Sequence, residues 1–410
     1  MTLNYIWFGF FVVAFIVAVF KAALYGQTEV FTEMVNSTFD MSKTSVTLSI
    51  NLLGGMCLWL GLMRIAEEGG LIKILAKYIG PFFKRLFPEI PTDHPATGSI
   101  IMNFSANILG LDNAATPIGL KAMKEMQDLN KDKDTASNAQ IMFLVLNTSG
   151  LSIIPLTILI DRSGLGATNP TDVFLPILLA TFCSTIVGLI TVSIYQRINL
   201  LDKVILGYLG AMLILLGSFI YYLTGLGQEE LNETSTFISN FIIFATIILF
   251  LALGFTKKIN LFSTFVEGAK EGFEITLKIV PYLIAFLVAI GVFRASGAFD
   301  YILTGLKFMI SLTGLNTDFV DALPVAIMKP LSGGTARGMM FETIEVHGVD
   351  SFIGRLASTL RGATETTFYI VAVYFGSVNI KNIRYAISAG LIADLAGILA
   401  AIVFGYMFFH

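Results

Sequence analysis

Long apolar runs without charged residues constrain this chain more than any other feature. A helix needs about 20 mostly apolar residues to cross the hydrocarbon core of a bilayer. Runs that meet or approach this length recur along the chain at residues 4–20, 44–63, 138–160, 173–195, 204–228 and 235–256. Shorter charge-free runs follow at 279–293 and 366–380, and residues 385–410 contain one acid, Asp394. The pattern predicts an all-α polytopic membrane protein, which also contacts membrane lipids.

The composition excludes several other classes of protein. Charged residues make up 13% of the chain, whereas a soluble domain carries about 25%. The net charge of −3 gives no basic field that would recruit nucleic acid. The two cysteines and three histidines form no disulfide framework and no metal-binding spacing. We expect no nucleic-acid partner, no cofactor, no bound metal and no enzyme activity.

The charges between the apolar runs predict the orientation of the chain, because basic loops stay in the cytoplasm. Basic residues gather in the connections that contain Lys121–Lys133, Arg197–Lys203, Lys257–Lys258 and Lys381–Arg384. Acidic residues dominate other connections, among them the segment from Glu342 to Asp350. This threading predicts a cytoplasmic amino terminus and an outer carboxyl terminus. Residues 71–87 and 262–273 read as amphipathic helices at the membrane surface.

The second half of the chain repeats features of the first. Apolar spans end at Arg64 and again at Arg294, 230 residues later. Ile101-Met102-Asn103 has a counterpart in Ile327-Met328-Lys329 at an offset of 226 residues. The order and near-constant offset predict two homologous halves, 1–200 and 201–410. The loop charges favour inverted-topology repeats, an architecture common in secondary transporters, over parallel copies made by gene fusion.

Two matching segments are unlike simple spanning helices. Residues 96–111 are too short to cross the bilayer, and Gly and Pro punctuate both this segment and its counterpart at 322–340. Irregular backbone is tolerated at membrane depth only inside protein or beside a water-filled cavity. The pattern predicts a re-entrant or broken helical hairpin in each half. The alternative is a pair of amphipathic helices on the membrane surface.

Two polar clusters interrupt otherwise apolar spans. One is Asn147-Thr148-Ser149-Gly150, and the other runs from Arg361 to Thr367 and includes Glu365. Charges at the bilayer centre need partners or water. Glu365 and Arg361 therefore either line a solute site or pair with each other. Asp394 is either a partner for an arginine or a proton carrier.

These motifs carry a family resemblance over nearly the whole chain. The segment from Leu109 to Met123, with Leu146–Ser149 and Ile154-Pro155, resembles the spore maturation protein A family. The segments Pro330–Gly334, Thr364–Tyr369 and Ala372–Gly376 resemble the spore maturation protein B family. Together they look like a natural fusion within the nucleoside-recognition, or Gate, domain group. That group is related to concentrative nucleoside transporters, so the resemblance implies a polytopic protein of the bacterial inner membrane with a transport-like architecture.

The sequence predicts a transporter or permease of a small polar solute, with its site near the midplane between the halves. The alternative is a membrane scaffold or sensor that reuses a transporter fold; an intramembrane enzyme is disfavoured because motifs such as GxSxG are absent. The predicted solute-binding residues are Asn103, Asn107, Asp112, Asn113, Asn147, Thr148, Ser149, Lys329, Ser332, Thr335, Arg337, Arg361, Thr364, Glu365 and Thr366. Their cations outnumber Glu365, which favours an anionic solute. A coupling ion, either a proton or sodium, and a homo-oligomer are compatible with this class.

Overall fold

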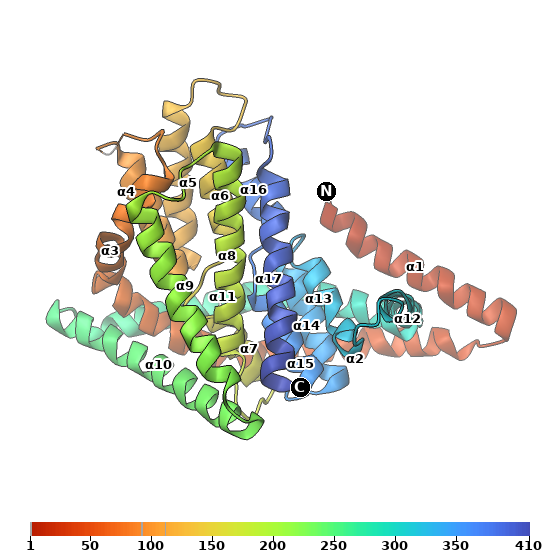
Figure 1. Ribbon diagram of the computed structural model, residues 1–410. Coiled ribbons are helices and arrows are strands. Elements are labelled where there is room, and N and C mark those ends of the chain that lie inside the picture. Colours follow the sequence, from red (N-terminus) through yellow and green to blue (C-terminus); the bar gives the residue numbers. More distant parts are fainter. Residues whose placement is uncertain (1, 92, 111) are drawn as a thin grey trace.

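The computed structural model describes residues 2–91, 93–110 and 112–410, without the side chains at 2–4, 6, 112–114, 228, 232, 278, 279 and 282. Within this part the chain is helical and forms no strand (Figure 1). The elements are α1 (Thr2–Tyr25), α2 (Glu29–Glu68), α3 (Leu71–Leu86), α4 (Pro95–Ile108), α5 (Asp112–Leu129), α6 (Asn138–Thr148), α7 (Leu156–Gly164), α8 (Phe174–Gln196), α9 (Lys203–Thr224), α10 (Gln228–Thr256), α11 (Leu261–Ala295), α12 (Ala298–Ser311), η1 (Asp318–Ala322), α13 (Leu323–Met328), α14 (Gly333–His347), α15 (Phe352–Gly362), α16 (Thr367–Ser377) and α17 (Ala386–Phe409).

The helices confirm a multi-pass membrane protein. In the described part of the chain, six are long and apolar enough to span a bilayer, namely α1, α2, α8, α9, α10 and α17. A bent pair, α11 and α12, meets the same criteria with an angle of 73° between its members. The prediction of one continuous helix over residues 138–160 is wrong. That run divides into α6 and α7, because Gly150 adopts a left-handed conformation and Pro155 begins the next helix.

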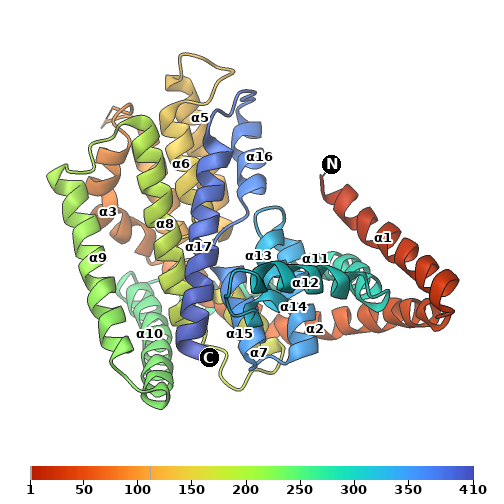
Figure 2. The ribbon, with the colours of Figure 1, turned by 45° about the vertical axis from the view of Figure 1, so that its right-hand side comes forward.

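The two halves have inverted topologies, as the loop charges predict. Helix α8 and its counterpart α17 stand side by side in both ribbon views (Figures 1 and 2). Tyr195 near the end of α8 stacks on Tyr385 at the start of α17, with ring centroids 4.4 Å apart. At the other end, Asp172 just before α8 binds Arg355, whose guanidinium lies over Phe409 at the end of α17. The two helices are therefore antiparallel.

Helix α2 and its counterpart α11 repeat this antiparallel relation and run across the α8–α17 pair (Figure 2). Thr264 near the start of α11 donates a hydrogen bond to Glu68 at the end of α2, over 3.1 Å. At the far end, Gly291 lies against Met41. The segment 262–273 is thus not a separate surface helix. It forms the first part of the 35-residue α11, which packs along α2. The predicted amphipathic segment 71–87 does form a helix of its own, α3, which exposes Lys73 and Lys77 and buries Ile72 and Phe83.

Each half contains a broken hairpin. Helices α4 and α5 pack against each other in the first half, and the short α13 joins α14 in the second through an irregular segment at 329–332. The alternative of surface helices does not hold for α14, because its residues from Thr335 to Ile344 are buried. The hairpins, together with the broken pairs α6–α7 and α15–α16, bring irregular backbone from both halves into the interior.

Candidate functional site

A cavity of about 1210 Å³ lies between the two halves. Its wall includes the ends of α6 and α15, the starts of α7 and α14, and the breaks between these helices. Both halves therefore contribute irregular backbone to one space, as expected for a site built from interrupted helices.

The two breaks touch directly at the wall of the cavity. The backbone N–H of Glu365, in the second break, donates a hydrogen bond to the carbonyl oxygen of Thr148, at the end of α6, over 2.9 Å. Gly150 makes this approach possible. Its φ is +67°, and a β-carbon there would lie 3.0 Å from the backbone nitrogen of Glu365.

Helix amino termini face the cavity. Ser332 caps α14 by accepting a hydrogen bond from the backbone N–H of Thr335 over 3.2 Å, and Gly333 and Gly334 of the first turn line the wall. Helix α7 begins at the wall with Leu156, and Thr366 precedes the first residue of α16 there. The positive ends of helix dipoles favour negative charge. The starts of α7, α14 and α16 therefore favour binding of an anionic group in the cavity.

Charged side chains line the same wall. The ammonium of Lys329 lies 3.6 Å from a carboxylate oxygen of Glu365, whose side chain is half exposed. Arg337 forms a two-point ion pair with the fully buried Asp161, in which Nε lies 3.0 Å from Oδ2. Arg361 approaches the same carboxylate at 3.9 Å. Among the described side chains, three cations and two carboxylates therefore meet here.

The sequence left open whether Arg361 and Glu365 pair with each other or line a solute site, and these contacts decide it. The two residues are not partners of each other. Glu365 pairs with Lys329, whereas Arg361 is directed to Asp161 and to the hydroxyl of Thr157, 3.3 Å away. Two separate ion pairs replace the single one considered from sequence.

Asparagines from the first half form a connected cluster beside the cavity. Asn107 donates a hydrogen bond to the side-chain oxygen of Asn147 over 2.7 Å, and Asn103 donates one to the carbonyl of Ala115 over 2.8 Å. Tyr374 of the second half also reaches Asn147, at 3.4 Å. Through Asn107 and Asn147 the cluster offers neutral amide groups to the cavity.

The remaining wall is apolar and aromatic. It combines Phe82 and Phe83 of α3, Tyr208 of α9 and Phe286 of α11 with Phe104 of α4. Phe83 stacks on Phe104 with ring centroids 4.6 Å apart, which gives this side a rigid surface. The cavity thus has a polar face and an apolar face, as small-molecule sites commonly do.

The structure divides the predicted site residues into three groups. The first group lines the cavity and comprises Asn107, Asn147, Lys329, Ser332, Arg337, Arg361, Glu365 and Thr366. The second group is buried behind the wall and comprises Asn103, Thr148, Ser149, Thr335 and Thr364. Asp112 and Asn113 begin α5, but their side chains lie outside the described part of the structure.

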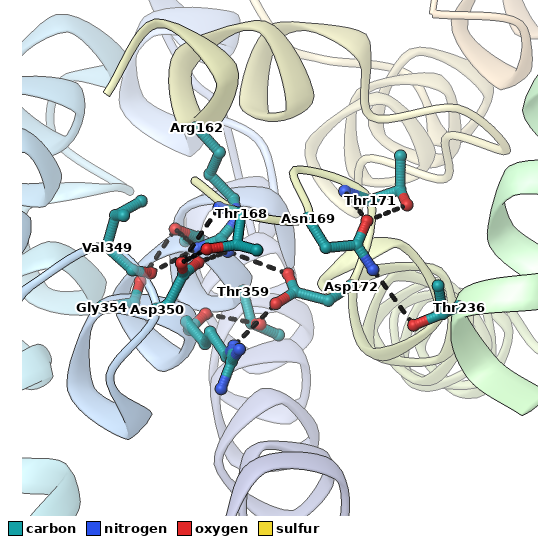
Figure 3. A network of polar contacts seen from close by, with 12 residues as sticks. Arg162, Thr168, Asn169, Thr171, Asp172, Thr236, Val349, Asp350, Gly354 and Thr359 are labelled. Atoms are coloured by element: carbon teal, nitrogen blue, oxygen red, sulfur yellow. Dashed lines mark hydrogen bonds and ion pairs between the residues drawn. The ribbon is translucent and has the colours of Figure 1, made fainter. Parts of the chain in front are cut away.

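Asp161 and Arg162 were missed from sequence, although they end the apolar run 138–160 with two adjacent opposite charges. Arg162 is completely buried and belongs to a second network (Figure 3). It lies 2.9 Å from Asp172 and 3.3 Å from Asp350, and it donates to the carbonyl of Val349 over 2.9 Å. The network ties the end of α7 to the loop before α15 in the other half.

Asp350 receives enough donors to remain ionised in this loop. Burial acts to raise the pKa of its carboxyl group. Hydrogen bonds from the backbone and hydroxyl of Thr168, together with the charges of Arg162 and Arg355, outweigh burial and hold the pKa below its ordinary value. The ion pairs of Arg162 with Asp172 and Asp350 therefore connect the two halves, and we call them the ionic clamp.

The position of Glu342 departs from the sequence-based interpretation. Glu342 was grouped with an acidic outer segment, but it is buried within α14 and pairs with Arg294 of α11. Arg64, the counterpart of Arg294, is partly exposed and pairs with Glu68 at 3.0 Å. Among the described residues, no three His, Cys, Asp or Glu side chains come together in a way that could hold a metal ion.

The Gate family, described as nucleoside recognition, matches residues 49–160 and 276–381, which is more than half of the chain. Spore maturation protein B of Bacillus subtilis (strain 168) is 49% identical over 162 residues, which cover 40% of this chain and 88% of that protein. Spore maturation protein A of the same organism is 40% identical over 187 residues, covering 46% of this chain and 92% of that protein. No solved structure matches.

Proposed function

The chain belongs to the Gate family of nucleoside-recognition proteins, and we propose that it is a transporter or permease of a small polar solute in the bacterial cytoplasmic membrane. The observation that carries this proposal is the cavity of about 1210 Å³, at which broken helices of two inverted halves meet. Inverted repeats with interrupted helices at their interface are the architecture of many secondary transporters.

The chemistry of the wall favours an anionic solute. Three cations, Lys329, Arg337 and Arg361, gather at the described wall, and three helix amino termini add their positive dipole ends. Lys329 is the cation best suited to the solute, because its ammonium is 3.6 Å from a half-exposed carboxylate that an incoming anion can displace. Asn107 and Asn147 would supply hydrogen bonds from the first half.

Flux through sealed liposomes tests the proposal. The purified protein is reconstituted, and uptake is measured over a panel of nucleosides, carboxylates and amino acids. We expect uptake of a polar solute without covalent change, with anions preferred, and reduced uptake of that solute by Lys329→Gln. A preference for cations that persists in Lys329→Ala would contradict the anionic assignment. Absence of flux across the whole panel would favour the scaffold or sensor alternative.

A cavity-filling variant sharpens the experiment. Gly334 lines the cavity, and a β-carbon at this position would meet no atom within 4 Å, so Gly334→Leu projects into the cavity without a backbone clash. Gly98 also lies in the first turns of a helix with open space around it, but it does not line the cavity. We expect Gly334→Leu to block flux and Gly98→Leu to leave it unchanged.

A further inference from the structure

Asp394 is a buried carboxylate within the apolar span α17. Asp394 is 1% exposed, and one of its carboxylate oxygens, Oδ2, accepts a hydrogen bond from the hydroxyl of Thr367 over 2.6 Å. The other oxygen, Oδ1, is buried and has no hydrogen-bond partner among the described residues. A buried polar atom without a partner requires an explanation, because such groups are rare in folded proteins.

The face of α17 that carries Asp394 lies against the breaks of both halves. Gly390, one turn before Asp394, lies close to Thr367 and Thr148, and Gly397, one turn after it, lies close to Thr364. A β-carbon at Gly397 would come within 2.5 Å of the Thr364 side chain, so the small residue permits close packing. The hydroxyl oxygen of Thr364 is also buried, with no partner in the part of the chain that the structure describes. Two oxygens in this region therefore remain unsatisfied.

No cation among the described residues forms an ion pair with Asp394. The charged side chains that interact electrostatically with Asp394 are Lys329 and Glu365. The ammonium and carboxylate of these two residues lie 3.6 Å apart at the cavity wall. Helices α6 and α8 bring neutral hydroxyl groups to this face, those of Thr148 and Ser184. An ionised carboxylate here would be desolvated and unpaired, which is unfavourable. The surroundings favour a neutral carboxyl group in the conformation described.

We propose that Asp394 is a proton-binding site that couples the movement of a proton to that of the solute, an inference that rests on the proposed transport function. In the conformation described, a proton is bound to Oδ1 and the Lys329–Glu365 pair at the cavity is complete. Release of that proton to water leaves a carboxylate behind the wall, and this carboxylate then competes with Glu365 for Lys329. Protonation of Asp394 thereby controls the charge that the solute meets.

The geometry favours a proton over a metal cation. Hard metal cations take six or more oxygen ligands in protein sites. Near Asp394 the described side chains offer two oxygens without a partner, Oδ1 of Asp394 and Oγ1 of Thr364. A proton needs one of them. Burial and the lack of a described cation also distinguish Asp394 from Glu365, whose side chain is half exposed and pairs with Lys329.

Infrared spectroscopy of the purified protein tests proton binding independently of transport. A protonated carboxyl group gives a carbonyl band that an ionised one lacks. We expect this band to decrease in Asp394→Asn but not in Asp134→Asn, a loop carboxylate that is paired with Lys381 and exposed. Thr367→Val keeps the carboxyl group but removes its donor, so the pH at which the band disappears should move upward.

Three results would overturn the assignment. The first is an identical carboxyl band in the wild type and Asp394→Asn at every pH. The second is a band that disappears at constant pH when choline chloride is replaced by sodium chloride, which would identify sodium as the ligand. The third is a Thr367→Val band that titrates at the same pH as in the wild type. All three can be observed even if the liposomes move no solute, so failure of this inference is distinct from failure of the proposed function.

Liposomes containing a pH-sensitive dye test the coupling itself. With a solute that the panel has identified, we expect inward solute flux to acidify the lumen in the wild type and in Asp134→Asn. Asp394→Asn should lose this acidification. If Asp394→Asn remains folded and solute flux still carries protons, the coupling role of Asp394 is refuted.

Discussion

Asp161 sets the charge balance of the cavity. It is fully buried on α7 and is shared by Arg337 of α14 and Arg361 of α15, so one carboxylate holds two cations of the opposite half. Its neighbour Arg162 pairs in the other direction, with Asp172 and Asp350. These two adjacent residues connect the solute cavity to the ionic clamp between the halves.

Removing the carboxylate of Asp161 should lower the stability of the folded protein. In Asp161→Ala, the buried Arg337 and the partly buried Arg361 lose their common partner, and breaking a buried ion pair on one side costs about 3–5 kcal/mol. Asp134→Ala breaks the exposed pair with Lys381 and should cost about 1 kcal/mol or less. Thermal unfolding in detergent measures both. Equal losses of stability in the two variants would show that Asp161 is not a central counter-charge.

Glycines determine how closely the long helices α2 and α11 approach each other. A β-carbon at Gly268 would lie 2.4 Å from the carbonyl oxygen of Leu60, and one at Gly272 would lie 2.6 Å from that of Met56. The obstructing atoms belong to the backbone, which cannot move aside as a flexible side chain can. Small residues at such positions let helices pack closely in membranes.

A larger residue at this crossing should separate the two helices. We expect Gly268→Leu to destabilise the protein by about 1–3 kcal/mol or more, because overpacking forces backbone shifts. Gly207 of α9 is the matched control, since a β-carbon there meets no atom within 4 Å. Gly207→Leu should leave thermal unfolding nearly unchanged. The close approach would not be a determinant of stability if the two variants unfolded at the same temperature.

The whole molecule combines two halves of opposite direction. Loop 130–137 precedes α6 and contacts the connection before α17, where Asp134 binds Lys381 at 3.2 Å. The loop before α15, which contains Asp350, contacts the end of α7 through Arg162, and Arg355 in the first turn of α15 binds Asp172 just before α8. Because α8 is one of the spanning helices, these two loops lie at opposite ends of a span.

Cysteine accessibility tests this topology. In a background with Cys57→Ser and Cys183→Ser, single cysteines replace Lys133, Lys381 or Ser351, and intact cells are treated with a membrane-impermeant maleimide. We expect Ser351→Cys to be labelled from outside, whereas Lys133→Cys and Lys381→Cys should need permeabilised cells. Labelling of Lys133→Cys and Ser351→Cys from the same side would contradict the inverted arrangement.

The sequence alone determined the class of protein, the apolar spans, the repeat and the broken segments, because each depends on local composition. Charge-free runs indicate lipid-facing helices, and recurring Gly and Pro mark interrupted ones, as at Gly150 and Pro330. Loop charges were sufficient for the inverted topology, since orientation follows the distribution of Lys and Arg. Eight of the residues proposed for the site line the cavity for the same reason, because polar groups in apolar spans need a wet or protein-filled surrounding.

Only the tertiary structure decided which charges meet. Residues 138–160 have the length of one span, and only the fold shows that α6 and α7 separate there to meet α15 and α16. Arg361 and Glu365 are neighbours in sequence, yet their partners come from α7 and from the α13–α14 connection. Within the described residues, no cation forms an ion pair with Asp394. The physical reason is that pairing energy depends on distance and burial across elements, and the order of residues along one chain specifies neither.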